Sequence, residues 1–223
     1  NRNKNRFVNK VKTKSNQSFS CKFCSDLNND FDFEMARSVF VYEDLWRELI
    51  FQFKYFNKKE LALPLAELLY IYFKEHYSMI NFDFIIPIPL YKKRKKQRGY
   101  NQAALLAENL SKKTNIEMSE DLLIRFIKTP PLYDLNREKR MSLINGVFSV
   151  NNDKKYLLNS KNILLIDDIF TTGTTTNEAA YTLKKEAKVK NVYVLTLSTS
   201  RVEGVVNSSF PAWDKMKNKL HLY

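Results

Sequence analysis

Two adjacent acids, one glycine and a run of threonines lie within one short segment, ILLIDDIFTTGTTT, at residues 163–176. Asp167 and Asp168 directly follow an apolar run that is typical of a buried strand. The polar residues that come next, ahead of a helical pattern, are Thr171, Thr172, Gly173, Thr174 and Thr175. In an open parallel sheet, ligands bind beyond the carboxyl ends of the strands. The segment is therefore predicted to form part of a binding edge.

The residue types in this segment suit a sugar phosphate. Backbone N–H groups at a helix N-terminus hold phosphate, Gly173 would let the backbone approach closely, and threonine hydroxyls add donors. Asp167 and Asp168 could accept hydrogen bonds from ribose hydroxyls, and a magnesium ion could bridge the remainder through water. We therefore expect a ribose 5-phosphate pocket. The structural alternative is that the acids end a strand and the threonines cap the following helix.

A second candidate segment, YKKRKKQRGYNQ at residues 91–102, follows the predicted strand end PIPL. It is expected to form a basic loop, and its candidate anion-binding residues are Lys92, Lys93, Arg94 and Arg98. Such cations could hold pyrophosphate as it leaves or bind the phosphates of DNA. They could also be a solvated surface loop. Tyr91 and Tyr100 flank the cations and could either stack on bases or pack against the protein.

Alternating strand and helix patterns would position both segments. Helical patterns cover residues 43–56, 59–77, 99–113 and the stretch from the threonine turn to about 187. Strand patterns are FDFIIPIPL (82–90), LLIRFIK (122–128), GVFSV (146–150), the apolar run 163–166 and NVYVLTLS (191–198). Because strands that alternate with helices pair in parallel, we predict an α/β fold with helices on both faces of a parallel sheet.

Length and charge restrict the protein class. The 223 residues carry a formal net charge of +13, which favours phosphates, nucleic acids or anionic lipids as partners, although codon usage rich in Lys and Asn could also cause it. No apolar run is long enough for a membrane span and no signal peptide is evident, so a cytoplasmic location is expected. We expect a flexible leader over residues 1–42, one domain over 43–201 and a tail of unknown role over 202–223.

Three segments together resemble the ComF family. PIPLYKKRKKQRGYNQAALLAENL is similar to that family's signature, and DDIFTTGTT is similar to the phosphoribosyl pyrophosphate motif of type I phosphoribosyltransferases. A third segment, IRFIKTPPLYDLNREKRMSLINGVFSV, matches at Arg125, Thr129, Arg137, Arg140, Asn145 and Phe148. It departs from the family at Leu132, where glutamine is usual. The resemblance covers about residues 21–201.

The resemblance implies a type I phosphoribosyltransferase-like core that binds phosphoribosyl pyrophosphate with Mg²⁺, behind a small zinc-binding N-terminal element. Asp167 and Asp168 would lie at the reacting sugar. It also implies a role in natural transformation, with single-stranded DNA, a competence helicase and other DNA-uptake proteins as partners. Three functions stay open: transfer of phosphoribose to an unidentified acceptor, a non-catalytic DNA-binding competence factor, and purine or pyrimidine salvage. Salvage explains neither RGYNQ nor the upstream cysteines.

Cys21 and Cys24 form CKFC, which has the spacing of half a thiolate zinc site. Tetrahedral zinc needs more ligands, whereas the chain has only these cysteines, and His76 and His221 are distant in sequence. A redox pair would open a helix after a strand, and neither pattern is present here. Since ComF proteins usually carry further cysteines upstream, we expect the partner ligands to precede Asn1. Two unbound thiols are the alternative.

Overall fold

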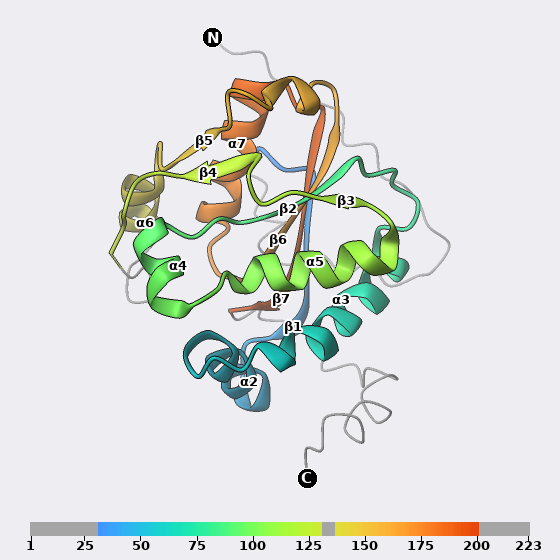
Figure 1. Cartoon of the computed structure of the whole chain (residues 1–223), viewed down its shortest axis with the longest axis vertical. Coiled ribbons are helices and arrows are strands. Elements are labelled where there is room, and N and C mark those ends of the chain that lie inside the picture. Colours follow the sequence, from blue (N-terminus) through green and yellow to red (C-terminus); the bar gives the residue numbers. More distant parts are fainter. Residues whose placement is uncertain (1–30, 131–136, 201–223) are drawn as a thin grey trace.

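A five-stranded parallel sheet lies at the centre of the molecule (Figure 1). The computed structural model describes residues 31–130 and 137–200. The strands are β1 (Met35–Val41), β2 (Phe84–Pro87), β3 (Glu117–Met118), β6 (Asn162–Phe170) and β7 (Asn191–Thr199), arranged in the order β1-β7-β6-β2-β3. Every neighbouring pair in this sheet is parallel. The predicted α/β fold, a parallel sheet flanked by helices, is confirmed.

Helices cover both faces of the sheet. One face packs against α2 (Asp44–Tyr55), α3 (Ala62–His76) and α5 (Gln102–Thr114), with the 3-10 turn η1 (Lys59–Leu61) between α2 and α3. The other face packs against α7 (Thr174–Ala187). Because side chains alternate along a strand, Leu164 and Ile166 of β6 enter the α3 and α5 layer, whereas Ile163 and Leu165 enter the α7 layer. This alternation also decides where the two acids of β6 point.

A small hairpin lies outside the parallel sheet. Its strands are β4 (Leu123–Arg125) and β5 (Phe148–Val150), which pair antiparallel, and α6 (Arg137–Ile144) precedes β5. Carboxylates of α7 fix the hairpin, since Glu178 accepts a hydrogen bond from Gly146 N at 2.7 Å and Glu186 accepts one from Val150 N at 2.8 Å. The segments LLIRFIK and GVFSV therefore form strands as predicted, but they pair with each other and do not join the main sheet.

The edge strand β1 corrects the predicted leader of residues 1–42. Met35 to Val41 pair with Tyr193 to Thr199 of β7, so the domain includes residues that the sequence pattern assigned to the leader. All seven β1 residues are only partly buried, which explains why no strong apolar run marks the strand. A Ser38 Oγ–Thr196 Oγ1 hydrogen bond of 2.7 Å joins the two strands through side chains.

The basic segment after β2 is also corrected, because it forms helix α4 (Lys92–Arg98) where a loop was expected. α4 ends at Gly99, whose φ of 79° is the left-handed geometry that favours glycine. Its position is fixed by the next residues: Asn101 Nδ2 donates to Ile88 O at 3.0 Å, and the Tyr100 hydroxyl donates to Phe53 O.

A 3-10 turn, η2 (Lys155–Leu158), leads into β6. No helix of residues 31–130 and 137–200 is long and apolar enough to cross a membrane.

Candidate functional site

The acids of β6 lie in its last four residues and point to opposite faces of the sheet. β6 continues past them to Phe170, with Asp167 opposite Thr196 of β7. By the alternation of the strand, Asp167 lies on the α7 and hairpin face, and Asp168 lies on the α2 and α3 face. A ligand above this edge can therefore contact one carboxylate from each side of the strand.

Asp168 forms an ion pair with a lysine that the sequence did not single out. Lys54 Nζ lies 2.9 Å from Asp168 Oδ1, and both side chains are largely buried. Lys54 comes from the last turn of α2, more than a hundred residues earlier in the chain. No motif surrounds this lysine, because it is one cation on an amphipathic helix. The packing of α2 on the sheet alone places it at the site.

Asp167 has a different environment. Burial and the neighbouring Asp168 carboxylate raise the pKa of Asp167 to about 7. Three features oppose this rise: the Asp168 backbone N–H donates to Asp167 Oδ1 at 2.8 Å, and Lys54 and Arg125 contribute positive charge. The two neighbouring acids are therefore not equivalent, since Asp168 has a cation in direct contact and Asp167 holds its proton near neutral pH.

The threonine turn leads directly into α7. Thr172 Oγ1 and Thr174 Oγ1 share a hydrogen bond of 2.7 Å, and Thr176 Oγ1 donates to Gly173 O at 3.0 Å. α7 begins at Thr174, and the first N–H groups of a helix have no partner within the helix. Thr171, Thr172, Thr174 and Thr175 are all partly buried. The threonine turn and the first N–H groups of α7 thus directly follow the acids, and phosphate binding by the turn stays a prediction.

The structure shows a further reason for a glycine at position 173, which the sequence alone did not reveal. Its φ is +73°, and a Cβ atom there would lie 2.8 Å from the ring of Phe170 and 3.2 Å from that of Phe31. Phe31 in turn stacks on Phe33 with 4.6 Å between ring centroids. The glycine is therefore required by aromatic packing under the turn and by the positive φ, while its predicted role in backbone approach to a ligand stays a prediction.

Arg125 connects the acids with the basic helix. It is buried at the end of β4, where Nη2 donates to Thr129 Oγ1 at 2.6 Å, and its Nε has no partner among the described residues. Burial and the charge of Arg94 lower the pKa of Arg125, while Asp167 acts in the opposite direction. Arg125 is therefore close enough to both groups to interact with them. The family resemblance included Arg125, but sequence reasoning gave it no role.

The cations of α4 divide into two groups. Lys92 and Lys93 are exposed, whereas Arg94 and Arg98 are partly buried. Arg98 Nη1 donates to Gln102 Oε1 and its Nη2 to Tyr55 Oη, both at 3.2 Å. Of the residues predicted to bind pyrophosphate, Arg94 is close enough to Arg125 for its charge to lower the pKa of that guanidinium. The other three lie on the same helix, and Arg98 contacts α2 and α5.

Of the two tyrosines considered for stacking on bases, Tyr100 is a packing residue. It is 6% exposed, and its hydroxyl is bonded to Phe53 O. Tyr91 is partly buried, and its carbonyl accepts hydrogen bonds from Arg94 N and Lys95 N in the first turn of α4. The Tyr100 ring is therefore not open for stacking on a base.

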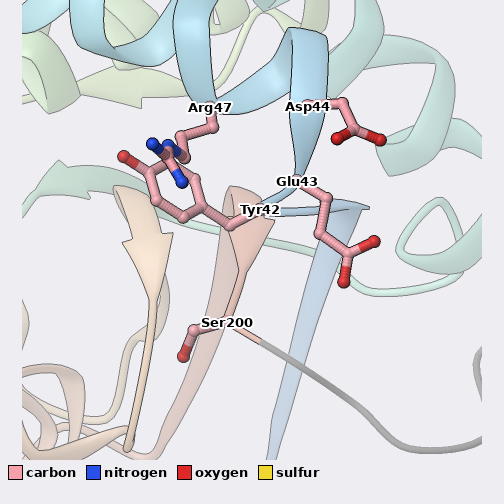
Figure 2. A pocket seen from close by; sticks show the side chains of 5 residues that line it. All are labelled: Tyr42, Glu43, Asp44, Arg47 and Ser200. Atoms are coloured by element: carbon pink, nitrogen blue, oxygen red, sulfur yellow. The ribbon is translucent and has the colours of Figure 1, made fainter.

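A shallow hollow of about 590 Å³ lies at the C-terminal ends of β1 and β7, the same end of the sheet as the two acids (Figure 2). Its lining residues are Tyr42, Glu43, Asp44, Arg47 and Ser200. Figure 2 shows the Tyr42 ring beside the Arg47 side chain, with both acids on the other side of the hollow. Two carboxylates against one guanidinium do not favour a phosphate group. The hollow therefore differs in charge from the acid and threonine edge.

Metal ligands are scarce in the part of the chain that the structure describes. Residues 31–130 and 137–200 contain no cluster of three or more His, Cys, Asp or Glu side chains that could hold an ion. Asp167 and Asp168 still suit Mg²⁺, which is usually bound by one or two carboxylates together with substrate phosphates and water. Cys21, Cys24 and Leu132 lie outside the described residues, and so do residues 1–30 of the predicted leader and the predicted tail 202–223.

No family model matches the chain, but curated relatives do. Competence protein ComFC of Bacillus subtilis is 32% identical over 171 residues, which cover 74% of this chain and 64% of the relative. Competence protein F of Haemophilus influenzae is 34% identical over 143 residues, which cover 61% of each chain. The chain is therefore similar to competence proteins of the ComF family over most of its length. The predicted resemblance is confirmed.

The chain also matches relatives with another name. DNA utilization protein YhgH of Escherichia coli strain K12 is 26% identical over 138 residues, covering 60% of this chain and 59% of that protein. The matches to these relatives thus span about 59–64% of the relatives' lengths. Because more than a third of each relative's length lies outside these matches, the activity of the whole relatives does not transfer to this chain.

Solved structures similar to the chain include a phosphoribosylpyrophosphate amidotransferase and a phosphoribosyltransferase. A glutamine phosphoribosylpyrophosphate amidotransferase from B. subtilis aligns with 16% identity and a TM-score of 0.42, covering 76% of this chain and 38% of that one. An adenine phosphoribosyltransferase aligns with 16% identity and a TM-score of 0.39, covering 64% and 73%. Because these scores are low, the fold assignment rests on the strand order and the flanking helices.

Proposed function

We propose that this protein binds phosphoribosyl pyrophosphate with Mg²⁺ at the carboxyl edge of β6 and transfers its phosphoribosyl group to an acceptor. The observation that carries the proposal is the arrangement at one sheet edge. Two acids on opposite faces of β6 stand directly before a hydroxyl-rich turn at the N-terminus of α7, and Arg125 and Arg94 lie on the Asp167 side.

Each part of the edge has a chemical task in this proposal. Asp167 and Asp168 accept hydrogen bonds from the ribose hydroxyls, and the turn of residues 171–175 holds the 5-phosphate through backbone N–H groups and hydroxyls. The cations Lys92, Lys93, Arg94 and Arg98 hold the pyrophosphate. Lys54 must share Asp168 with the sugar, because it already occupies one carboxylate oxygen.

The reaction is a substitution at the anomeric carbon. The acceptor nucleophile forms a bond to that carbon while the bond to the pyrophosphate oxygen breaks, and the acceptor loses its proton to solvent. Cations near the pyrophosphate stabilise the charge that develops on the leaving group. Mg²⁺, when bound by the acids and the substrate, would add further charge neutralisation.

The setting we propose is natural transformation, in which the protein handles incoming single-stranded DNA beside a competence helicase and other uptake proteins. The names of the relatives, competence protein and DNA utilization protein, support this setting. A non-catalytic competence factor that uses the same edge as a ligand sensor is the second candidate. It is favoured by the Lys54–Asp168 ion pair, which restricts one of the two acids in the absence of ligand.

Thermal unfolding with phosphoribosyl pyrophosphate and Mg²⁺ tests the site. A ligand that binds the native state alone raises the melting temperature, by an amount that grows with its concentration above the dissociation constant. Thr174→Val should reduce the shift, because it removes a hydroxyl of the turn. The same measurement with pyrophosphate alone and with ribose 5-phosphate alone separates the two halves of the site.

Asp83→Asn is the matched control. Asp83 is a carboxylate at the other end of β6, where it accepts hydrogen bonds from Lys161 Nζ at 2.9 Å and Asn162 N at 2.8 Å. This variant should melt at a lower temperature than the parent but keep the full ligand shift. An equal ligand shift in the Thr174→Val variant and the parent would contradict the site assignment. Release of pyrophosphate in the presence of candidate acceptors then distinguishes an enzyme from a sensor.

A further inference from the structure

Three exposed aromatic side chains form a continuous patch at the C-terminal end of α2, which we name the α2 ledge. Its residues are Phe51, Tyr55 and Phe56, which are 44%, 56% and 61% exposed. The Phe51 ring centroid lies 5.0 Å from that of Tyr55 and 5.8 Å from that of Phe56. The buried residues of α2 are on its other face. The three side chains thus lie outside the core, and about half of their surface is open to solvent.

The basic helix α4 adjoins the ledge directly. The Arg98 guanidinium carbon lies 5.0 Å from the centroid of the Tyr55 ring, and Arg98 Nη2 donates to Tyr55 Oη. Figure 1 shows α2 and α4 as neighbours at the same end of the sheet. The aromatic and cationic surfaces are therefore continuous through the contact between Arg98 and Tyr55.

Most of the α4 lysines are available to a ligand. Lys92, Lys93 and Lys96 are exposed and pair with no carboxylate of the described residues, whereas Lys95 forms a 2.8 Å ion pair with Glu120. α4 has the sequence KKRKKQR and no acidic residue. The surface beside the ledge therefore carries a high density of positive charge, because three of the four α4 lysines have no carboxylate partner among the described residues.

We propose that the α2 ledge and the exposed face of α4 together bind single-stranded nucleic acid, with bases stacked on the rings and phosphates on the lysines. Aromatic rings beside a basic track are the combination that single strands need, because unpaired bases have free faces and every nucleotide carries a phosphate. A duplex would contribute its phosphates but would keep its bases stacked inside. The ledge therefore selects for single strands.

The openness of the ledge favours a polymer over a small acceptor of the phosphoribosyl group. Pockets for small ligands bury most of the ligand surface, while the three ledge rings are about half exposed and lie side by side. The ledge nevertheless ends near the proposed sugar-phosphate site, since Tyr55 directly follows Lys54, the partner of Asp168. The proposal extends the proposed function in transformation, but the surface itself does not depend on phosphoribosyl pyrophosphate binding.

Fluorescence anisotropy with a labelled oligothymidylate of about 16 nucleotides tests the proposal. Tyr55→Ala should weaken binding about tenfold, and Phe51→Ala combined with Phe56→Ala should weaken it about as much again, because each stacked base contributes strongly to affinity. Tyr181→Ala is the matched control: Tyr181 is 41% exposed on α7, and Lys185 Nζ lies 5.2 Å from its ring centroid. The control variant should bind like the parent protein.

Salt dependence separates stacking from charge. The ledge variants should lower affinity without changing the slope of log affinity against log salt, since they remove no cation. Lys92→Ala with Lys96→Ala should make the slope less steep by about 0.7 for each lost phosphate contact. Competition with an unlabelled duplex of the same sequence should displace the labelled strand less well than the unlabelled single strand does.

Three outcomes would overturn the proposal: unchanged affinity in the ledge variants, an equal loss in the Tyr181 variant, or a change of oligomeric state in the ledge variants without loss of oligonucleotide binding. The last result would make the ledge a protein interface. Thermal shifts with phosphoribosyl pyrophosphate, measured on the same proteins, keep the two proposals apart. Absence of that shift in the parent would remove the proposed function, while a ledge-dependent affinity for single strands would leave the surface assignment intact.

Discussion

Replacing Asp167 by asparagine should stabilise the ligand-free protein above neutral pH and have little effect at pH 4. The pKa of Asp167 is raised to about 7, first by burial and then by the charge of Asp168. The folded protein therefore holds this proton between about pH 4 and 7, whereas the unfolded chain has already lost it, so wild-type stability falls as the pH rises through that window. Asparagine removes this loss, because it has no proton to release.

The size of the effect follows from the pKa difference. A carboxyl with a pKa of 3.8 in the unfolded chain and about 7 in the folded protein corresponds to about 4 kcal/mol at pH 8. Asp167 is only partly buried, and water screens such a group, so we expect about 1–2 kcal/mol. For a chain of this size that is a rise in melting temperature of roughly 2–8 °C.

Urea unfolding of both proteins between pH 4 and 8 is the assay. The stability difference between variant and parent should be small at pH 4, grow up to about pH 7 and then level off. Asp168→Asn is the control, and it should be destabilising at pH 8 because it leaves the largely buried Lys54 without its partner. If Asp167→Asn were destabilising at every pH, or if its effect did not vary with pH, the assigned environment of Asp167 would be wrong.

Three further predictions concern the turn, the ligand and the cysteines. Gly173→Ala should lower stability by about 1 kcal/mol or more by urea unfolding, because its φ is +73° and the new Cβ would meet Phe170. Affinity for phosphoribosyl pyrophosphate with Mg²⁺ should fall by up to about tenfold per pH unit below pH 7 in titration calorimetry, since binding requires ionised Asp167. Metal analysis should find bound zinc that is lost when Cys21 and Cys24 become serine, because these cysteines have the spacing of zinc ligands.

Local patterns predicted most of the elements but not all of their partners. The apolar face of α2 and the run before Asp167 each reflect burial of a regular element, and burial is visible in sequence as periodicity. β1 lacks this signal because it is an edge strand whose residues are only partly buried. β3 has two residues, too few for any pattern. The hairpin strands were visible as segments, but their antiparallel pairing depends on contacts with α7.

The sequence pattern also wrongly predicted a loop for the basic segment, which is helical. KKRKKQR was expected to be a loop because it has no apolar residue to mark a helix face. It is helical because its flanking residues are fixed: Tyr91 O accepts the first turn's N–H groups, and Gly99 ends the helix. Asn101 then ties the following turn to β2. The motif RGYNQ is in this respect structural, since Tyr100 and Asn101 are buried and hydrogen-bonded.

The sequence by itself determined the chemistry of the edge: two acids after a buried strand, hydroxyls and a glycine before a helix, and cations after a second strand end. These features are contiguous in the chain, so their order can be recognised without knowing the fold. The tertiary structure decided which side chains from other parts of the chain lie beside this edge. Lys54 pairs with Asp168, the charge of Arg125 acts on Asp167, and the α2 ledge adjoins Arg98. These interactions join segments that lie far apart in the chain, and only the packing of helices and the hairpin on the sheet brings such groups together.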